Sequence, residues 1–257
     1  MKKSNAIYLY ILFFIALIVE CFLILKAERL AISRHYEAYK SLSEYRLLVR
    51  PVLVLSLFPL VFKRFNNNFR GLFLYFGLLT TWLADVFVLT QQYNIILIGI
   101  TLYTCSYIFL TASYQKLIKR TVKKRDSDVY IYLTIWAILV ILLFALDGLK
   151  EKIGYALLVF HIIMLIRMVY VSIKLRKRLT SKTIANYIII GSLFAAAANI
   201  IYGISTFKFN NNHPSLDVLT AFCYGLFLFF SVFAMSYMKE NQQQKSEKEK
   251  GHSHHRH

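Results

Sequence analysis

Apolar residues occur in eight long runs along the chain, and a short polar or charged stretch separates each run from the next. A helix needs roughly 20 mostly apolar residues to cross the hydrocarbon core of a bilayer, and the runs approach or reach that length. The pattern predicts an all-α, polytopic membrane bundle with transmembrane helices at residues 6–26, 48–62, 71–90, 95–115, 129–147, 153–174, 186–206 and 217–238. We expect one integral membrane domain over residues 1–238, followed by a disordered, polar, His-rich cytoplasmic tail over residues 239–257.

Composition and charge agree with a membrane protein. Of the 257 residues, 58% are hydrophobic, with 21 Phe and 18 Tyr against only 13 acidic side chains. The net charge of +18 would suit a nucleic-acid partner, but Lys and Arg gather in short loops that lie on one side of the predicted topology. We therefore expect no nucleic-acid partner, cytoplasmic N- and C-termini and a location in a bacterial inner (plasma) membrane. The charged segment over residues 26–50 is expected to lie as an interfacial helix.

A short internal repeat links two of the predicted helices. Gly77-Leu78-Leu79 precedes Asp85 by the same number of residues as Gly191-Ser192-Leu193 precedes Asn199. The repeat predicts that helices 71–90 and 95–115 are a parallel copy of helices 186–206 and 217–238, with sites at the repeat interface. We expect Asp85 and Asn199 to lie close together on facing helices.

Asp85 is the candidate around which a site would form. A carboxylate at membrane depth costs on the order of 3 kcal/mol on insertion scales, so it usually faces a protein interior or a wet cavity. Thr81 lies one turn earlier on the same helix face. Counting along the helices puts further polar groups at a similar depth, and we expect them to line one polar cavity that opens outward, together with Arg50 at the outer entry to its helix: Glu20, Tyr103, His161, Asn199 and Tyr224. Tyr107 lies one turn from Tyr103 in the same tyrosine stripe.

Each of these residues also has a purely structural interpretation. His161 can be a satisfied core histidine, and the tyrosines can pack helices and bond across them. No HExxH sequence or His/carboxylate spacing supports a metal site, so we expect neither a metal nor a cofactor. Arg167 is a further cation inside an apolar run, and both snorkelling inward and pairing with a carboxylate remain open for it.

Several stretches occur in an order that resembles a known family. They are Arg50-Pro51-Val52-Leu53, FGLLTTWLADVFVL with Asp85, HIIMLIRM from His161, GSLFAAAAN with Asn199, and Tyr224 in the last helix. From about residue 45 to 238 the chain resembles the YhhN-like lysoplasmalogenase family of eight-helix membrane proteins. It departs from that family's pattern in several places and so looks like a divergent member. Ala84 replaces a glycine, Asn199 replaces a second aspartate, the helix at 95–115 lacks a histidine, and no glutamine follows Tyr224.

The resemblance implies hydrolysis of the vinyl-ether bond of a lysoplasmalogen. That reaction needs an acid to protonate carbon and a group that stabilises the resulting positive charge. The resemblance implies that Asp85 is the acid, which burial would keep protonated, and that Glu20 and Asn199 support it. Arg50 would lie near the lipid phosphate, with Thr81, Tyr103, Tyr107, His161 and Tyr224 binding the substrate, which is a lysophospholipid or lysoplasmalogen from the membrane.

Two other functional classes remain open from the sequence. The departures at Asn199 and at the missing histidine favour a catalytically degenerate protein that binds a lipid or a partner. The internal repeat and the intramembrane carboxylate favour a small-solute transporter, although transporters typically break their helices at the site and helices 71–90 and 186–206 contain no proline. The oligomeric state is left open.

Overall fold

The structure is a computed structural model that describes residues 3–32, 36–65, 69–88, 93–118, 127–145, 150–179, 181–209 and 214–253. Every regular element in these ranges is an α-helix, which confirms the predicted all-α bundle. In chain order the helices are α1 (Lys3–Ile32), α2 (Tyr36–Phe65), α3 (Phe69–Val88), α4 (Tyr93–Ile118), α5 (Ser127–Ala145), α6 (Lys150–Arg176), α7 (Lys182–Phe209) and α8 (Pro214–Ser253).

Length and composition allow five of the described helices to cross a membrane in full. These apolar spans are Ala6–Ala27, Ile96–Leu117, Lys152–Arg176, Lys182–Ser205 and Ser215–Met235. The helices α2, α3 and α5 contain shorter apolar stretches, at Leu48–Phe62, Leu72–Val88 and Tyr130–Ile141. Many large apolar side chains on α1, α5 and α6 are exposed, as expected for surfaces in contact with lipid tails.

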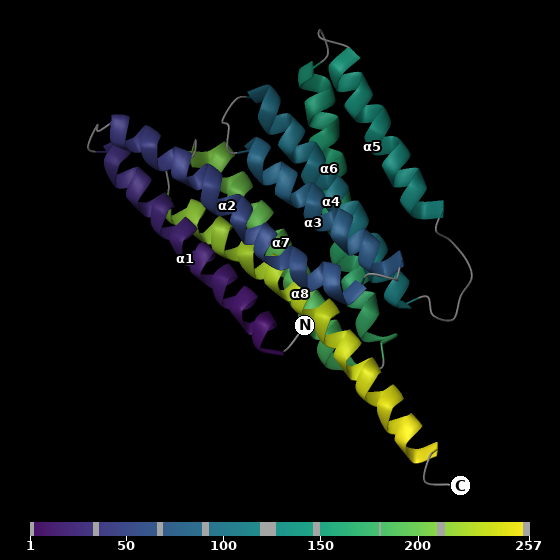
Figure 1. Cartoon of the computed structure of the whole chain (residues 1–257). Helices are drawn as coiled ribbons and strands as arrows, with labels where there is room; N and C mark the ends of the chain where they lie inside the picture. Colours follow the sequence, from purple (N-terminus) through teal and green to yellow (C-terminus); the bar gives the residue numbers. More distant parts are fainter. Residues whose placement is uncertain are drawn as a thin grey trace.

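The packing of the helices repeats between the two halves of the chain. The helix α2 packs on α1, α3 and α8, and in the same way α6 packs on α5, α7 and α4. The pairs α3 with α4 and α7 with α8 correspond, as do α1 with α8 and α5 with α4. In Figure 1 the two corresponding helices α1 and α5 lie on opposite edges of the bundle. The repeating unit is therefore α1–α4 against α5–α8, which extends the predicted pairs of helices to units of four.

The glycines of the sequence repeat lie at a close helix contact in each unit. A Cβ atom on Gly77 would lie 3.1 Å from Leu110 Cγ of α4, and one on Gly191 would lie 3.2 Å from Phe230 Cβ of α8. Both gaps are too tight for a larger side chain unless the neighbour shifts. Small residues let helices approach closely inside a membrane, so the repeat seen in the sequence reports one packing device used twice.

Two segments differ from what the sequence predicts. The charged stretch over 26–50 is divided between the end of α1 and the first turns of α2, so it does not form a separate interfacial helix. Arg50 consequently lies well inside α2 rather than at its start. The helix α8 continues to Ser253, through most of the stretch expected to be disordered, which agrees with the good helix propensity of its Gln, Lys and Glu residues. The side chains of this extension and residues 254–257 lie outside the described part of the chain.

Candidate functional site

Asp85 is completely buried and accepts hydrogen bonds from three side chains on three other helices. Arg50 of α2 donates its Nε–H to Oδ1 at 2.9 Å, and the hydroxyl of Tyr103 of α4 donates to the same oxygen. The hydroxyl of Tyr224 of α8 donates to Oδ2 at 2.6 Å. We call these four residues the charged cluster.

The charged cluster has the donor set of an ionised carboxylate. An arginine stays protonated in proteins and the two phenols point their hydrogens at the carboxylate oxygens, so each contact favours a negative Asp85. Arg50 also donates from Nη2 to the hydroxyl of Tyr103 at 3.2 Å and lies 5.3 Å from the ring centre of Tyr224. Its side chain is 16% exposed. Arg50 is therefore engaged inside the protein, rather than placed at a helix entry where we expected it to meet a phosphate.

A second polar network surrounds Asn199 of α7. The Nε2 atom of His161 of α6 lies 2.9 Å from Asn199 Oδ1, and its Nδ1 atom lies 2.9 Å from Thr104 Oγ1 of α4. The amide nitrogen of Asn199 donates to the hydroxyl of Tyr107 and to the carbonyl of Ala195, both at 2.8 Å. A carbonyl only accepts, which fixes the orientation of the amide and makes His161 Nε2–H the donor to Asn199. We call His161, Asn199, Tyr107 and Thr104 the neutral cluster.

The two clusters are neighbours along α4. Tyr103 belongs to the charged cluster and Tyr107 to the neutral cluster, and four residues of helix separate them by about 6 Å along the axis. The rings of Tyr103 and Tyr224 meet edge to face with centres 6.1 Å apart. Among the described residues α3 and α7 do not pack on each other. The expectation that Asp85 and Asn199 lie on facing helices is therefore wrong, because α3 packs on α2 and α4 whereas α7 packs on α6 and α8.

Glu20 and Thr81, two further predicted site residues, lie outside both clusters. Glu20 of α1 is buried and pairs with Arg46 Nε of α2 at 3.3 Å, one turn before Arg50. Thr81 donates to the carbonyl of Gly77 and shares a 2.6 Å hydrogen bond with Ser106 of α4, so it joins α3 to α4. Within the described ranges, no three His, Cys, Asp or Glu side chains lie together in a way that could hold a metal ion.

Sequence reasoning missed two residues of this region, Arg46 and Thr104. The spacing of Arg46 and Arg50, one helical turn apart, is a signal that could have found Arg46 once α2 was known to begin at Tyr36. Thr104 carried no signal, because a threonine in a helix usually bonds to a carbonyl of its own helix. Thr104 makes that bond, to Ile100 at 2.8 Å, and contacts His161 as well.

The model of the YhhN family matches residues 45–233 of this chain. The chain belongs to the YhhN family. All residues of both clusters fall inside the matched region, whereas Glu20 precedes it. No curated protein and no solved structure showed significant similarity to the chain. Family membership and the apolar helical bundle together make this a YhhN-family membrane protein.

Proposed function

We propose that this YhhN-family protein hydrolyses the vinyl-ether bond of a lysolipid, releasing a fatty aldehyde. The observation that carries the proposal is the charged cluster, a fully buried Asp85 held by Arg50 and two tyrosines, with a histidine network one helical turn away. An ionisable residue inside a membrane bundle costs stability, so such residues usually serve a function.

The reaction needs two groups from the protein: an acid that gives a proton to the substrate and a negative charge that stabilises the resulting cation. A proton adds to the carbon of the double bond that is remote from the ether oxygen, which leaves an oxocarbenium ion. Water adds to that cation and loses a proton, and the hemiacetal then separates into the glycerol hydroxyl and the aldehyde. The proton taken up in the first step is returned in the second, so no other reactant is needed.

The contacts support a division of roles between the two clusters. The donors around Asp85 keep it ionised, which suits a group that stabilises the oxocarbenium ion and not the proton donor expected from the sequence. His161 takes the proton-donor role. When the ring carries two protons, Nδ1–H donates to the hydroxyl of Thr104, which itself donates to the carbonyl of Ile100. After the Nδ1 proton has passed to the substrate, the Thr104 hydroxyl can turn from that carbonyl and donate to Nδ1 of the neutral ring, while Nε2–H stays bonded to Asn199.

Partial exposure indicates where a lipid would reach the clusters. Asp85, Tyr107 and His161 are buried, whereas Arg50, Tyr103 and Asn199 are intermediate in exposure. A substrate that contacts these three partly exposed residues would leave Asp85 shielded from bulk water. Water exclusion strengthens the electrostatic stabilisation that Asp85 would provide.

The test is aldehyde release by the purified protein from three lysolipids that differ only in the sn-1 linkage: vinyl ether, alkyl ether and acyl ester. We expect turnover of the vinyl ether alone, and a fall of about 10²- to 10⁴-fold in His161→Gln, the usual range for a lost general acid. Asp217→Asn is the control, because Asp217 of α8 bonds to Ser205 and lies outside both clusters. Equal turnover of the vinyl ether by wild type and His161→Gln would remove His161 from the mechanism.

A second function, lipid binding without catalysis, has an observation of its own in its favour. Asn199 places a neutral amide where the family resemblance implies a carboxylate, and that amide has all of its contacts inside the protein. Wild-type protein that binds the vinyl-ether lysolipid and releases no aldehyde would favour this reading. A transporter is less well supported, since α3 and α7 run unbroken through both cluster positions.

The orientation completes the proposal. The excess of Lys and Arg in one set of loops supports cytoplasmic termini and clusters in the outer half of the inner membrane. A cysteine introduced by Gln92→Cys should react with an impermeant maleimide on intact cells, and one introduced by Thr121→Cys only after permeabilisation. The reverse labelling pattern would invert the assignment.

A further inference from the structure

Glu20 and Arg46 form an ion pair beside the charged cluster. Glu20 of α1 is only 1% exposed, and its Oε1 atom lies 3.3 Å from Arg46 Nε of α2. Arg46 precedes Arg50 by one helical turn, so the two arginines share a face of α2, about 6 Å apart along its axis. The carboxylate of Asp85 attracts Arg50, and the carboxylate of Glu20 attracts it as well. Glu20 therefore acts on the charged cluster through its charge.

The carboxylate of Glu20 is less well compensated than that of Asp85. Asp85 accepts three hydrogen bonds. Glu20 accepts one, and its Oε2 atom is buried without a hydrogen-bond partner in the described part of the structure. A buried charge with incomplete compensation costs stability, so a residue that keeps one usually serves a function. The negative charge of Glu20 is thus only partly neutralised by its own contacts.

Without Glu20, these charged residues would have an excess of positive charge. Arg46, Arg50 and Asp85 are two cations and one anion, and Glu20 makes the numbers of cations and anions equal. An excess positive charge in a medium of low dielectric opposes the formation of another cation nearby. The oxocarbenium ion of the proposed reaction is such a cation.

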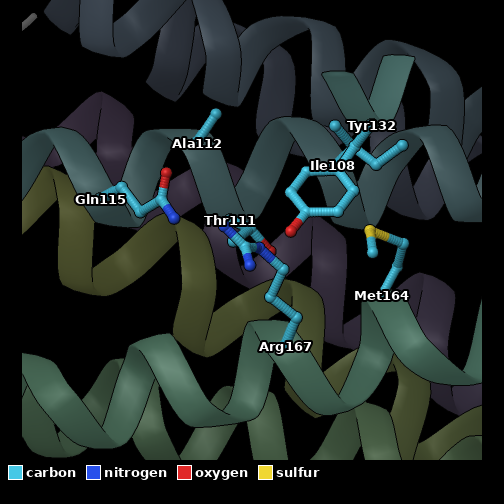
Figure 2. A pocket seen from close by; sticks show the side chains of 7 residues that line it. All are labelled: Ile108, Thr111, Ala112, Gln115, Tyr132, Met164 and Arg167. Carbon is cyan, nitrogen blue, oxygen red and sulfur yellow. The ribbon is translucent and has the colours of Figure 1, made fainter. Parts of the chain in front are cut away.

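The other half of the repeat has an apolar residue in place of the paired arginine. There His161 of α6 occupies the place of Arg50, and Leu157, one helical turn earlier, is fully buried. The cation of this half is Arg167 of α6, whose guanidinium carbon lies 4.3 Å from the ring centre of Tyr132. Figure 2 shows this cation among side chains of α4 and α5. The ion pair beside the charged cluster is therefore an addition to the packing that the two halves share.

Glu20 lies before residues 45–233, the region that the family model matches, whereas Arg46 and the charged cluster lie within it. We propose that Glu20 is a positioning residue that neutralises Arg46 and so leaves the negative charge of Asp85 available to a cation formed on the substrate. Glu20 acts through the two arginines and does not touch the substrate, in agreement with its 1% exposure. The inference rests on the proposed function for the identity of that cation.

The first test measures the binding of a cation, so it does not depend on turnover. The probes are two lysophospholipids without a vinyl-ether bond, one with an alkylammonium group in place of the sn-1 ether and one with a neutral alkyl ether. The ammonium group mimics the charge of the oxocarbenium ion. Glu20→Gln should weaken binding of the ammonium lipid about tenfold, the size expected for one charge acting over roughly 10 Å inside a protein. Binding of the ether lipid should not change.

Arg46→Gln separates an effect of charge from the loss of the ion pair. Both single variants break the same pair, so a purely structural role predicts a change in the same direction for both. We expect different directions, because Arg46→Gln removes a cation and should leave the ammonium lipid bound at least as tightly as in wild type. The double variant Glu20→Gln, Arg46→Gln again has equal numbers of cations and anions and should bind the ammonium lipid with nearly wild-type affinity.

Asp217→Asn is the matched control, because it removes a carboxylate of α8 that bonds to Ser205 and lies outside the ion pair and both clusters. Glu20→Asp keeps the charge and should retain most of the affinity for the ammonium lipid. Thermal unfolding of each variant in one detergent identifies any loss of folded protein. An equal loss of ammonium binding in Glu20→Gln and Arg46→Gln would overturn the charge role, and so would an unchanged affinity in Glu20→Gln.

Turnover of the vinyl-ether lysolipid tests the link to the proposed function. Glu20→Gln should lower kcat about tenfold with little change in KM, because the missing charge acts on a cation that forms only in the transition state. Cation binding that depends on Glu20, with no aldehyde release by wild type, would support the inference and remove the proposed hydrolysis. Aldehyde release with a kcat and a cation affinity that do not depend on Glu20 would support hydrolysis and remove the role of Glu20.

Discussion

In the first half of the chain α2 supplies Arg50 and α3 supplies Asp85, and in the second half α6 supplies His161 and α7 supplies Asn199. Each pair is completed by a tyrosine from the last helix of the opposite half: Tyr224 of α8 for the charged cluster and Tyr107 of α4 for the neutral cluster. The two clusters thus have one construction and differ in charge. The charged cluster is held together by a permanent cation and anion. In the neutral cluster the histidine can gain or lose a proton.

We propose that this difference gives the two clusters separate tasks. An ion pair inside a bundle is hard to rearrange, because breaking it leaves a charge without compensation in a medium of low dielectric. A neutral histidine with acceptors or donors on both ring nitrogens can change its protonation state at much lower cost. The comparison predicts that changes to the charged cluster lower stability as well as turnover, whereas changes to the neutral cluster mainly lower turnover.

The largest effect is expected from Asp85→Asn. The variant leaves Arg50, whose side chain is 16% exposed, without its carboxylate, and removal of one partner of a buried ion pair typically costs about 3–5 kcal/mol. Thermal and denaturant unfolding in one detergent measure this loss, with Asp217→Asn as the control. The double variant Arg50→Gln, Asp85→Asn should recover part of the stability. A single variant within about 1 kcal/mol of wild type would show that the pair is not a fixed element of the fold.

A smaller effect is expected when each cluster loses its tyrosine hydroxyl. Tyr224 donates to an ionised carboxylate, so Tyr224→Phe should cost about 1.5–3 kcal/mol, the range for hydrogen bonds to charged groups. Tyr107 accepts from the amide of Asn199, so Tyr107→Phe should cost only about 0.5–1.5 kcal/mol. The two unfolding measurements use the same substitution in one protein. Equal losses would contradict the assignment of charge to one cluster and neutrality to the other.

The sequence predicts the helices well, because most apolar runs are about as long as a helix needs to be to cross the bilayer. It also identifies every residue of both clusters except Thr104, since a polar side chain inside an apolar run is conspicuous. It does not identify their partners. Glu20 and Asp85 have a similar predicted depth, yet Glu20 pairs with Arg46 and Asp85 with Arg50. In the described part of the chain α1 packs on α2 and α8 and not on α3.

The misplacement of Arg50 has a related cause. The residues before it are charged and predict a surface segment, which would put Arg50 at a helix entry near the lipid phosphate. The helix begins at Tyr36 instead, and the additional turns place Arg50 opposite Asp85. Depth along a helix can be counted from a sequence, but the direction in which a side chain points depends on which helix lies beside it.

The variant Asn199→Asp converts the neutral cluster into a charged one and so tests directly whether charge causes the difference between the clusters. The new carboxylate takes the position of the amide oxygen that accepts from His161, so His161 and residue 199 would pair as Arg50 and Asp85 do. It cannot donate to the carbonyl of Ala195, which now lies 2.8 Å from the amide nitrogen, so one carboxylate oxygen must turn away from that carbonyl and accept from Tyr107. We expect little net change in stability, because a new charge-assisted bond to His161 offsets a lost bond to the backbone.

The effect of Asn199→Asp on catalysis is measured as turnover of the vinyl-ether lysolipid. A second carboxylate stabilises the protonated form of His161 and the positive charge on the substrate, so we expect turnover to rise about tenfold, which corresponds to about 1.4 kcal/mol in the barrier. Asn199→Ala is the companion variant, since it removes the amide without adding charge, and its turnover should fall below wild type. If Asn199→Asp and wild type had the same turnover while Asn199→Ala fell, the amide would already do what a carboxylate does, and the two clusters would differ in charge without differing in task.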